Sequence, residues 1–125
     1  MRRIAVYGTL RRNFGNYRAL LEEQEFLGQE TLDLPYRMVS LGGFPGLVVS
    51  DKLHPIVIEV FNIDDECARS VDGLEGYPTF YTRTEIPTSF GDAWVYYLAN
   101  KDFKGLAPVE EGDWLKFITA KIPVQ

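Results

Sequence analysis

One segment of this chain joins a buried strand to a helix whose two ends are both marked in the sequence. Residues 56–63 are mostly β-branched or aromatic, which predicts a central strand. Directly after them, Asp64 suits the N-cap of a helix. Gly76 suits a left-handed helix end, and Pro78 prevents the helix from continuing. The pattern therefore predicts a short helix over residues 64–74.

This helix has one apolar stripe and an acidic residue at its unfavourable end. Cys67, Val71 and Leu74 recur at helical spacing, so we expect them to form the buried face. Glu75 follows at the helix C-terminus, where the helix dipole favours a cation. The same dipole, combined with partial burial, raises the pKa of a carboxyl group and makes it a better base. Glu75 is therefore the first candidate for a functional residue.

The rest of the chain predicts many short strands and few helices. Strands are expected at residues 4–7, within 25–49, at 80–88 and at 93–99, with a brief helix at 16–24 and a packed turn or strand near 114–118. The last two full strands flank a glycine turn and are expected to form a β-hairpin. No repeat or linker divides residues 1–125, so we expect a single domain. Its class is α+β, with a mostly β, barrel-like sheet.

Composition excludes several classes of function. The net charge of −5 argues against binding to a phosphate backbone, so no nucleic-acid partner is expected. No run approaches the ~20 apolar residues of a membrane span, and the first apolar stretch is too short for a signal peptide. The single cysteine, Cys67, cannot form an internal disulfide and fits a cytoplasmic location. With one histidine, His54, little material remains for a metal site, and none is expected.

The loop after the first strand, Tyr7-Gly8-Thr9-Leu10, is the second candidate site. Gly8 lets the backbone turn sharply and approach a ligand. Consecutive amides in such a turn can hold a carboxylate or an oxyanion, and Arg11 and Arg12 add positive charge nearby. The alternative is an ordinary turn followed by a solvated pair of arginines. The full Walker pattern is absent, so nucleotide binding has little support.

Taken together, these segments resemble the gamma-glutamylcyclotransferase family, in the branch similar to gamma-glutamylamine cyclotransferase. The resemblance rests on Val6-Tyr7-Gly8-Thr9-Leu10-Arg11 and on Leu74-Glu75-Gly76-Tyr77-Pro78-Thr79-Phe80-Tyr81-Thr82-Arg83. It implies a small mixed β-barrel with short flanking helices, and a cavity between the first loop and Glu75. Relatives often have a glycine directly after the basic residues, whereas here Asn13 and Phe14 precede Gly15. This difference leaves the shape of the pocket mouth, and so the preferred leaving amine, open.

The family's reaction is intramolecular. The α-amino group of a gamma-glutamyl compound attacks its own side-chain carbonyl, the ring closes to 5-oxoproline, and the amine leaves. Carried onto this chain, the resemblance makes Glu75 the general base and acid and makes Tyr7, Gly8, Thr9 and Leu10 the substrate-binding loop. Tyr81 is a further candidate for binding the substrate, although it also fits an ordinary aromatic position in a strand. The implied partner is a small gamma-glutamyl substrate, with no cofactor and no metal.

A lone carboxylate can suffice because the attacking amine and the carbonyl belong to one molecule. Acid–base catalysis of this kind typically contributes ~10²–10⁴-fold. Two other readings stay open: a non-catalytic module that binds a small carboxylate, and a related chemistry such as amide cleavage. Two charged strand residues are also open. Arg83 is expected to pair with a surface acid rather than with substrate, and Glu59 is either a second buried carboxylate or an outward-facing one.

Overall fold

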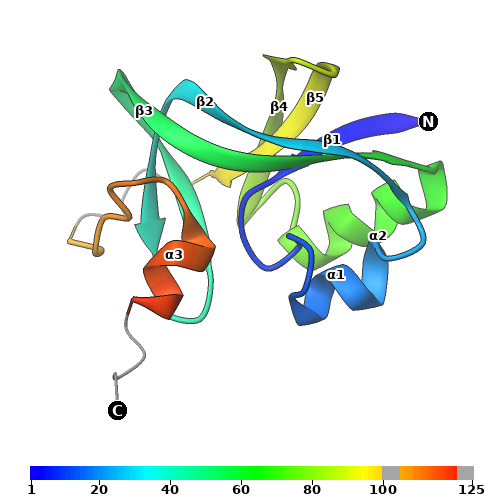
Figure 1. The fold of residues 1–125 in the computed structure, drawn as a ribbon, viewed down its shortest axis with the longest axis horizontal. Coiled ribbons are helices and arrows are strands. Elements are labelled where there is room, and N and C mark those ends of the chain that lie inside the picture. Colours follow the sequence, from blue (N-terminus) through cyan, green and yellow to red (C-terminus); the bar gives the residue numbers. More distant parts are fainter. Residues whose placement is uncertain (100–104, 121–125) are drawn as a thin grey trace.

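The computed structural model describes residues 1–99 and 105–120, which form one five-stranded sheet with three short helices (Figure 1). The sheet has the strand order β2-β3-β1-β5-β4. Helices α1 and α2 lie next to each other, and α3 lies at the other end of the molecule (Figure 1). In chain order the elements are β1 (Arg2–Val6), α1 (Gly15–Leu20), β2 (Glu25–Ser40), β3 (Pro45–Ile63), α2 (Asp65–Glu75), β4 (Tyr81–Thr88), β5 (Gly91–Leu98) and α3 (Trp114–Thr119).

The α+β class expected from the sequence is confirmed. The expected barrel is not, because the sheet is open. Strands β2 and β4 are its two edges, and no pairing among the described residues joins them. Strands β1 and β5 are parallel to each other, whereas the other neighbours are antiparallel. The long β2–β3 hairpin shifts register between Phe26 and Gly28 and again between Leu34 and Tyr36. Such irregularities bend a strand, and they curve this sheet without closing it.

The apolar run at residues 56–63 is a central strand, as predicted. It forms the second half of β3, between β2 and β1. Its side chains alternate between two hydrophobic cores, one on each face of the sheet, with Ile58 and Val60 in the first and Phe61 and Ile63 in the second. Burial on both faces explains why the run is continuously apolar.

Helix α2 begins and ends where the sequence predicts. The Asp64 side chain accepts a hydrogen bond from the backbone N–H of Cys67 at 2.7 Å, and Gly76 adopts the left-handed conformation with φ 64°. Cys67 and Val71 are buried as expected. The prediction for Leu74 is wrong, because its side chain is 46% exposed. The last turn of α2 lies beside a cavity instead of the core, so Leu74, at the end of the apolar stripe, lines that cavity.

The remaining elements agree in part with the sequence. The β4–β5 hairpin is confirmed. Residues 114–118, expected as a turn or strand, lie in helix α3, which the Asp113 side chain caps by accepting from the N–H of Lys116. Trp114 of this helix is buried and stacks on Phe117. Among the helices that the structure describes, none has the length and apolar character to cross a membrane.

Candidate active site

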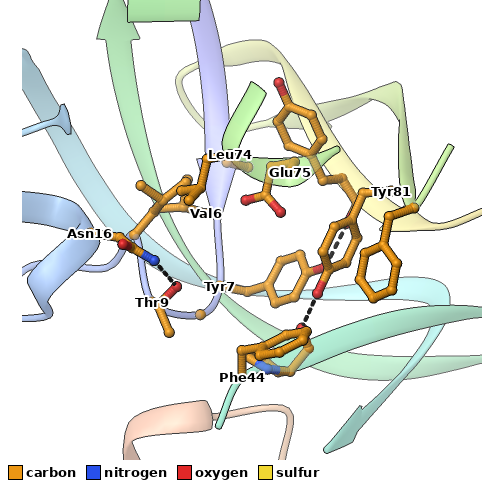
Figure 2. Close-up of a pocket in the computed structure, with 14 residues that line it drawn as sticks. Val6, Tyr7, Thr9, Asn16, Phe44, Leu74, Glu75 and Tyr81 are labelled. Atoms are coloured by element: carbon orange, nitrogen blue, oxygen red, sulfur yellow. Dashed lines mark hydrogen bonds between the residues drawn. The ribbon is translucent and has the colours of Figure 1, made fainter. Parts of the chain in front are cut away.

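The predicted site residues come together around one cavity of about 220 Å³ (Figure 2). Its walls come from the loop after β1, the last turn of α2, the start of β4 and the turn between β2 and β3. All six residues singled out in the sequence line it: Tyr7, Gly8, Thr9, Leu10, Glu75 and Tyr81. Strand β1 lies in the middle of the sheet, and the loop that follows it leaves the sheet beside the end of α2. This arrangement brings the first loop and Glu75 to the same cavity.

Glycine is required at position 8 by close packing against the next turn. A Cβ atom added at Gly8 would lie 2.7 Å from Cγ of Pro45. Real Cβ contacts are not that short, so a larger residue would push the first loop away from Pro45. The sequence prediction attributed this glycine to the approach of a ligand. The structure gives a second reason for it, which is the approach of the proline ring.

The backbone of the first loop carries unpaired amides. The turn is closed by the N–H of Arg11, which donates to the carbonyl oxygen of Gly8 at 2.9 Å. Within the part of the chain that the structure describes, the N–H groups of Gly8, Thr9 and Leu10 have no hydrogen-bond acceptor. All three residues line the cavity. Consecutive free amides of this kind form a binding site for an anion or a developing oxyanion.

Asn16 is a lining residue that the sequence reasoning missed. It lies in the first turn of α1, and its Nδ2 atom donates to Oγ1 of Thr9 at 2.8 Å (Figure 2). This hydrogen bond ties the first loop to α1 and fixes the Thr9 side chain. The available signal was a polar residue with helix-starting character directly after Gly15.

Glu75 is the last residue of α2, and its carboxylate points into the cavity (Figure 2). Burial raises the pKa of Glu75 to about 7. In the described part of the chain, no side chain or amide donates a hydrogen bond to this carboxylate that would offset the loss of water. A carboxyl group with this pKa is half ionised near neutral pH, so it can both accept and return a proton.

Three buried tyrosines surround Glu75, and each hydroxyl donates its proton elsewhere. Tyr7 donates to the carbonyl oxygen of Tyr96 at 2.7 Å, and Tyr81 donates to the carbonyl oxygen of Pro45 at 2.6 Å. Tyr96 donates to Oδ1 of Asp72. Burial raises the pKa of all three phenols, and the Glu75 charge adds to this; for Tyr96 the hydrogen-bonded Asp72 contributes more than Glu75 does. Toward a ligand these oxygens therefore act as hydrogen-bond acceptors, which suits an N–H group.

The two arginines after the loop point away from the cavity. Arg11 is only 3% exposed, so the reading of a solvated pair is wrong for this residue. Its Nε atom lies 3.0 Å from Oε2 of Glu59, and its Nη1 atom lies 2.8 Å from Oδ1 of Asp113. Arg12 binds the other oxygen of Glu59 through its backbone N–H and its Nε atom. Glu59 is thus a buried, paired carboxylate. It holds the first loop in place through Arg11 and Arg12, on the side away from the cavity.

Arg83 also lies outside the cavity lining. It forms an ion pair with Asp72 of α2, with 3.2 Å between Nε and Oδ1. Its guanidinium group lies 3.7 Å from the centre of the Trp94 ring and 3.9 Å from that of Tyr77. The expected pairing with an acid of the protein is therefore observed, although the acid lies on a helix instead of the adjacent strand.

The open α+β sheet thus carries a cavity in which a lone carboxylate faces a loop of free amides, an arrangement that suits a small-molecule ligand. The family described as gamma-glutamyl cyclotransferase, AIG2-like, matches residues 4–116, and the chain belongs to this family. It is 37% identical over 114 residues to the gamma-glutamylcyclotransferase family protein YtfP of Escherichia coli, covering 90% of this chain and 96% of that protein. It is 34% identical over 112 residues to a putative gamma-glutamylcyclotransferase of Vibrio cholerae, covering 89% and 93%.

A solved structure confirms the fold. The crystal structure of the uncharacterized protein PH0828 from Pyrococcus horikoshii superposes with a TM-score of 0.80 at 25% sequence identity. The match covers 96% of this chain and 95% of that one. The shared fold therefore extends over the whole described sheet and its helices.

Proposed function

We propose that this protein is a cyclotransferase that releases 5-oxoproline from a gamma-glutamyl amine or peptide, with Glu75 as general base and acid. The observation that carries this proposal is the Glu75 carboxyl group, which burial poises at a pKa of about 7 inside a cavity beside the free amides of the first loop. Membership of the gamma-glutamylcyclotransferase family supports the same reaction.

In the proposed mechanism the substrate supplies its own nucleophile. Glu75 takes a proton from the α-ammonium group, and the free amine attacks the γ-carbonyl carbon. A new C–N bond forms, and the negative charge that develops on the carbonyl oxygen is stabilised by the amides of Gly8, Thr9 and Leu10. Glu75 then gives its proton to the leaving nitrogen as the old C–N bond breaks. The second proton lost by the attacking nitrogen also ends on the departing amine, so no proton is consumed.

The tyrosine oxygens hold the substrate in the conformation needed for attack. Tyr7 and Tyr81 accept hydrogen bonds from the α-amino group or the scissile N–H, because their own protons are engaged with carbonyl oxygens of the protein. Holding the amine close to the carbonyl lowers the activation free energy by several kcal/mol, because it reduces the entropic cost of ring closure. Tyr81 is thus a substrate-binding residue in this scheme, as is the Tyr7–Leu10 loop.

The test is a mass-spectrometric assay for 5-oxoproline with a panel of gamma-glutamyl amines and dipeptides. Wild type is expected to release 5-oxoproline, and Glu75→Gln is expected to release none while keeping its fold, because an amide cannot accept the proton. Release of free glutamate would show amide hydrolysis instead. Binding of the panel without any product would show a non-catalytic binding module.

A further inference from the structure

The cavity has a polar floor and an apolar mouth. Tyr7 and Tyr81, which hold hydrogen bonds near Glu75, are buried. Phe44, Leu74 and Phe80 also line the cavity, but their side chains are 38%, 46% and 40% exposed. Large apolar side chains held at an opening in this way leave a surface that an apolar group of a ligand can cover.

The mouth is built from three separate elements. Phe44 lies in the turn between β2 and β3, Leu74 lies in the last turn of α2, and Phe80 directly precedes β4. The rings of Phe44 and Phe80 meet edge to face at 6.2 Å, and Phe80 packs against Tyr81 at 5.0 Å in the same manner. Figure 2 shows Phe44 and Leu74 on either side of the space into which the Glu75 carboxylate points. Aromatic surface therefore runs from the floor to the opening.

The charge of the cavity is as informative as its shape. Among the described residues that line it, none is a lysine, arginine or histidine, and Glu75 is the one carboxylate. Arg11 and Arg83 lie close in sequence to the lining residues Leu10 and Tyr81, respectively. Their side chains form ion pairs away from the cavity, with Glu59 and Asp113 for Arg11 and with Asp72 for Arg83. A carboxylate at the mouth would lose water beside a partly ionised Glu75 with no counter-charge in that lining.

We propose that the mouth selects the leaving amine, favouring an apolar, preferably aromatic, amine and disfavouring one that carries a carboxylate. This inference rests on the proposed function, because the reaction places the γ-carbonyl beside Glu75 and the first loop. The group attached to the scissile nitrogen then extends past Phe44, Leu74 and Phe80. The preferred substrate class is thus a gamma-glutamyl amide of an apolar amine, and gamma-glutamyl amino acids and peptides are poorer substrates.

Three substrates separate the two parts of this claim. Gamma-glutamyl-2-phenylethylamide and gamma-glutamylphenylalanine differ by one carboxylate, and gamma-glutamylmethylamide lacks the ring. We expect kcat/KM for 5-oxoproline release from the phenylethylamide to exceed that of the methylamide by about 3- to 10-fold, the size of one aromatic contact. We expect it to exceed that of gamma-glutamylphenylalanine by about fivefold or more, since the added charge has no partner at the mouth.

Variants of the mouth assign the effect to these residues. Phe44→Ala is expected to lower the phenylethylamide-to-methylamide ratio of kcat/KM by about 3- to 10-fold. Leu53→Ala removes an exposed leucine of β3 that is outside the cavity lining, and it should leave the ratio unchanged. An unchanged ratio in Phe44→Ala, or turnover of gamma-glutamylphenylalanine equal to that of the phenylethylamide, overturns the inference.

Binding to the inactive Glu75→Gln protein separates this inference from the proposed function. If wild type releases no 5-oxoproline from any of the three substrates, the proposed function fails. The affinities of Glu75→Gln for the phenylethylamide and the methylamide, measured by calorimetry, then decide the selectivity of the mouth. Tighter binding of the phenylethylamide by about threefold or more supports it, and equal affinities refute it.

Discussion

Replacement of Glu75 by glutamine should make the protein more stable at alkaline pH while removing its activity. The carboxyl group has a pKa of about 7 in the folded state, against an ordinary value of 4.5. A group whose pKa is raised by folding contributes stability that is fully present below the unfolded pKa and is lost as pH rises through the folded pKa. Wild type therefore loses this contribution between about pH 4.5 and pH 7, and the amide of Glu75→Gln does not titrate.

The size of the effect follows from the pKa difference. At 1.36 kcal/mol per unit, the shift from 4.5 to about 7 corresponds to roughly 3 kcal/mol as an upper limit. Glu75 is partly exposed, so solvent screening reduces the expected gain to about 1–2 kcal/mol. Urea unfolding followed by the fluorescence of Trp94 and buried Trp114 measures the free energy of unfolding at about pH 5 and about pH 8.5.

The quantity compared is the difference in unfolding free energy between Glu75→Gln and wild type at two pH values. Contributions from other titrating groups are the same in both proteins and therefore cancel. Glu75→Gln should lie close to wild type at about pH 5 and above it by 1–2 kcal/mol, roughly, at about pH 8.5. Glu85→Gln, at an exposed position of β4, is the matched control and should follow wild type at both. A stability difference for Glu75→Gln that does not change with pH would refute the argument, because the carboxylate would then pay no cost of desolvation.

Three further predictions test the site and its support. The kcat/KM for 5-oxoproline release should fall about tenfold per pH unit below pH 7, because Glu75 must be ionised to accept a proton; a rate independent of pH between about 5 and 7 would exclude it as the base. Glu59→Ala should lower the free energy of unfolding by about 3 kcal/mol, since it removes the partner of buried Arg11, and a urea-unfolding loss below about 1 kcal/mol would contradict this. Gly8→Val should raise KM for the gamma-glutamyl substrate, because its side chain collides with Pro45 and displaces the loop amides; steady-state kinetics giving an unchanged KM would count against the role of the loop.

Features set by neighbours in the sequence were predictable. The helix from Asp65 to Glu75 depends on the Asp64 cap and the Gly76 end, both of which are local signals, and it places Glu75 at the helix terminus. The β4–β5 hairpin is local in the same sense. Local signals therefore singled out Glu75 and the loop that follows β1, whereas the expectation that both face one cavity came from the resemblance to the family.

Features set by distant parts of the chain were not predictable. Leu74 was expected in the core because helical periodicity cannot tell whether a sheet or a cavity lies opposite the last turn. The strand order of the sheet depends on the parallel pairing of β1 with β5, which lies far along the chain. The buried state of Arg11 likewise depends on Glu59 and Asp113, which only the fold brings near.

The tie between Arg11 and Asp113 affects when the site can be completed during synthesis. These two residues are 102 positions apart, and Asp113 also caps α3. A nascent chain that has emerged only as far as β5 already contains the first loop and Glu75. It still lacks the carboxylate that completes the anchor of Arg11, so the loop gains its final support only when α3 has left the ribosome.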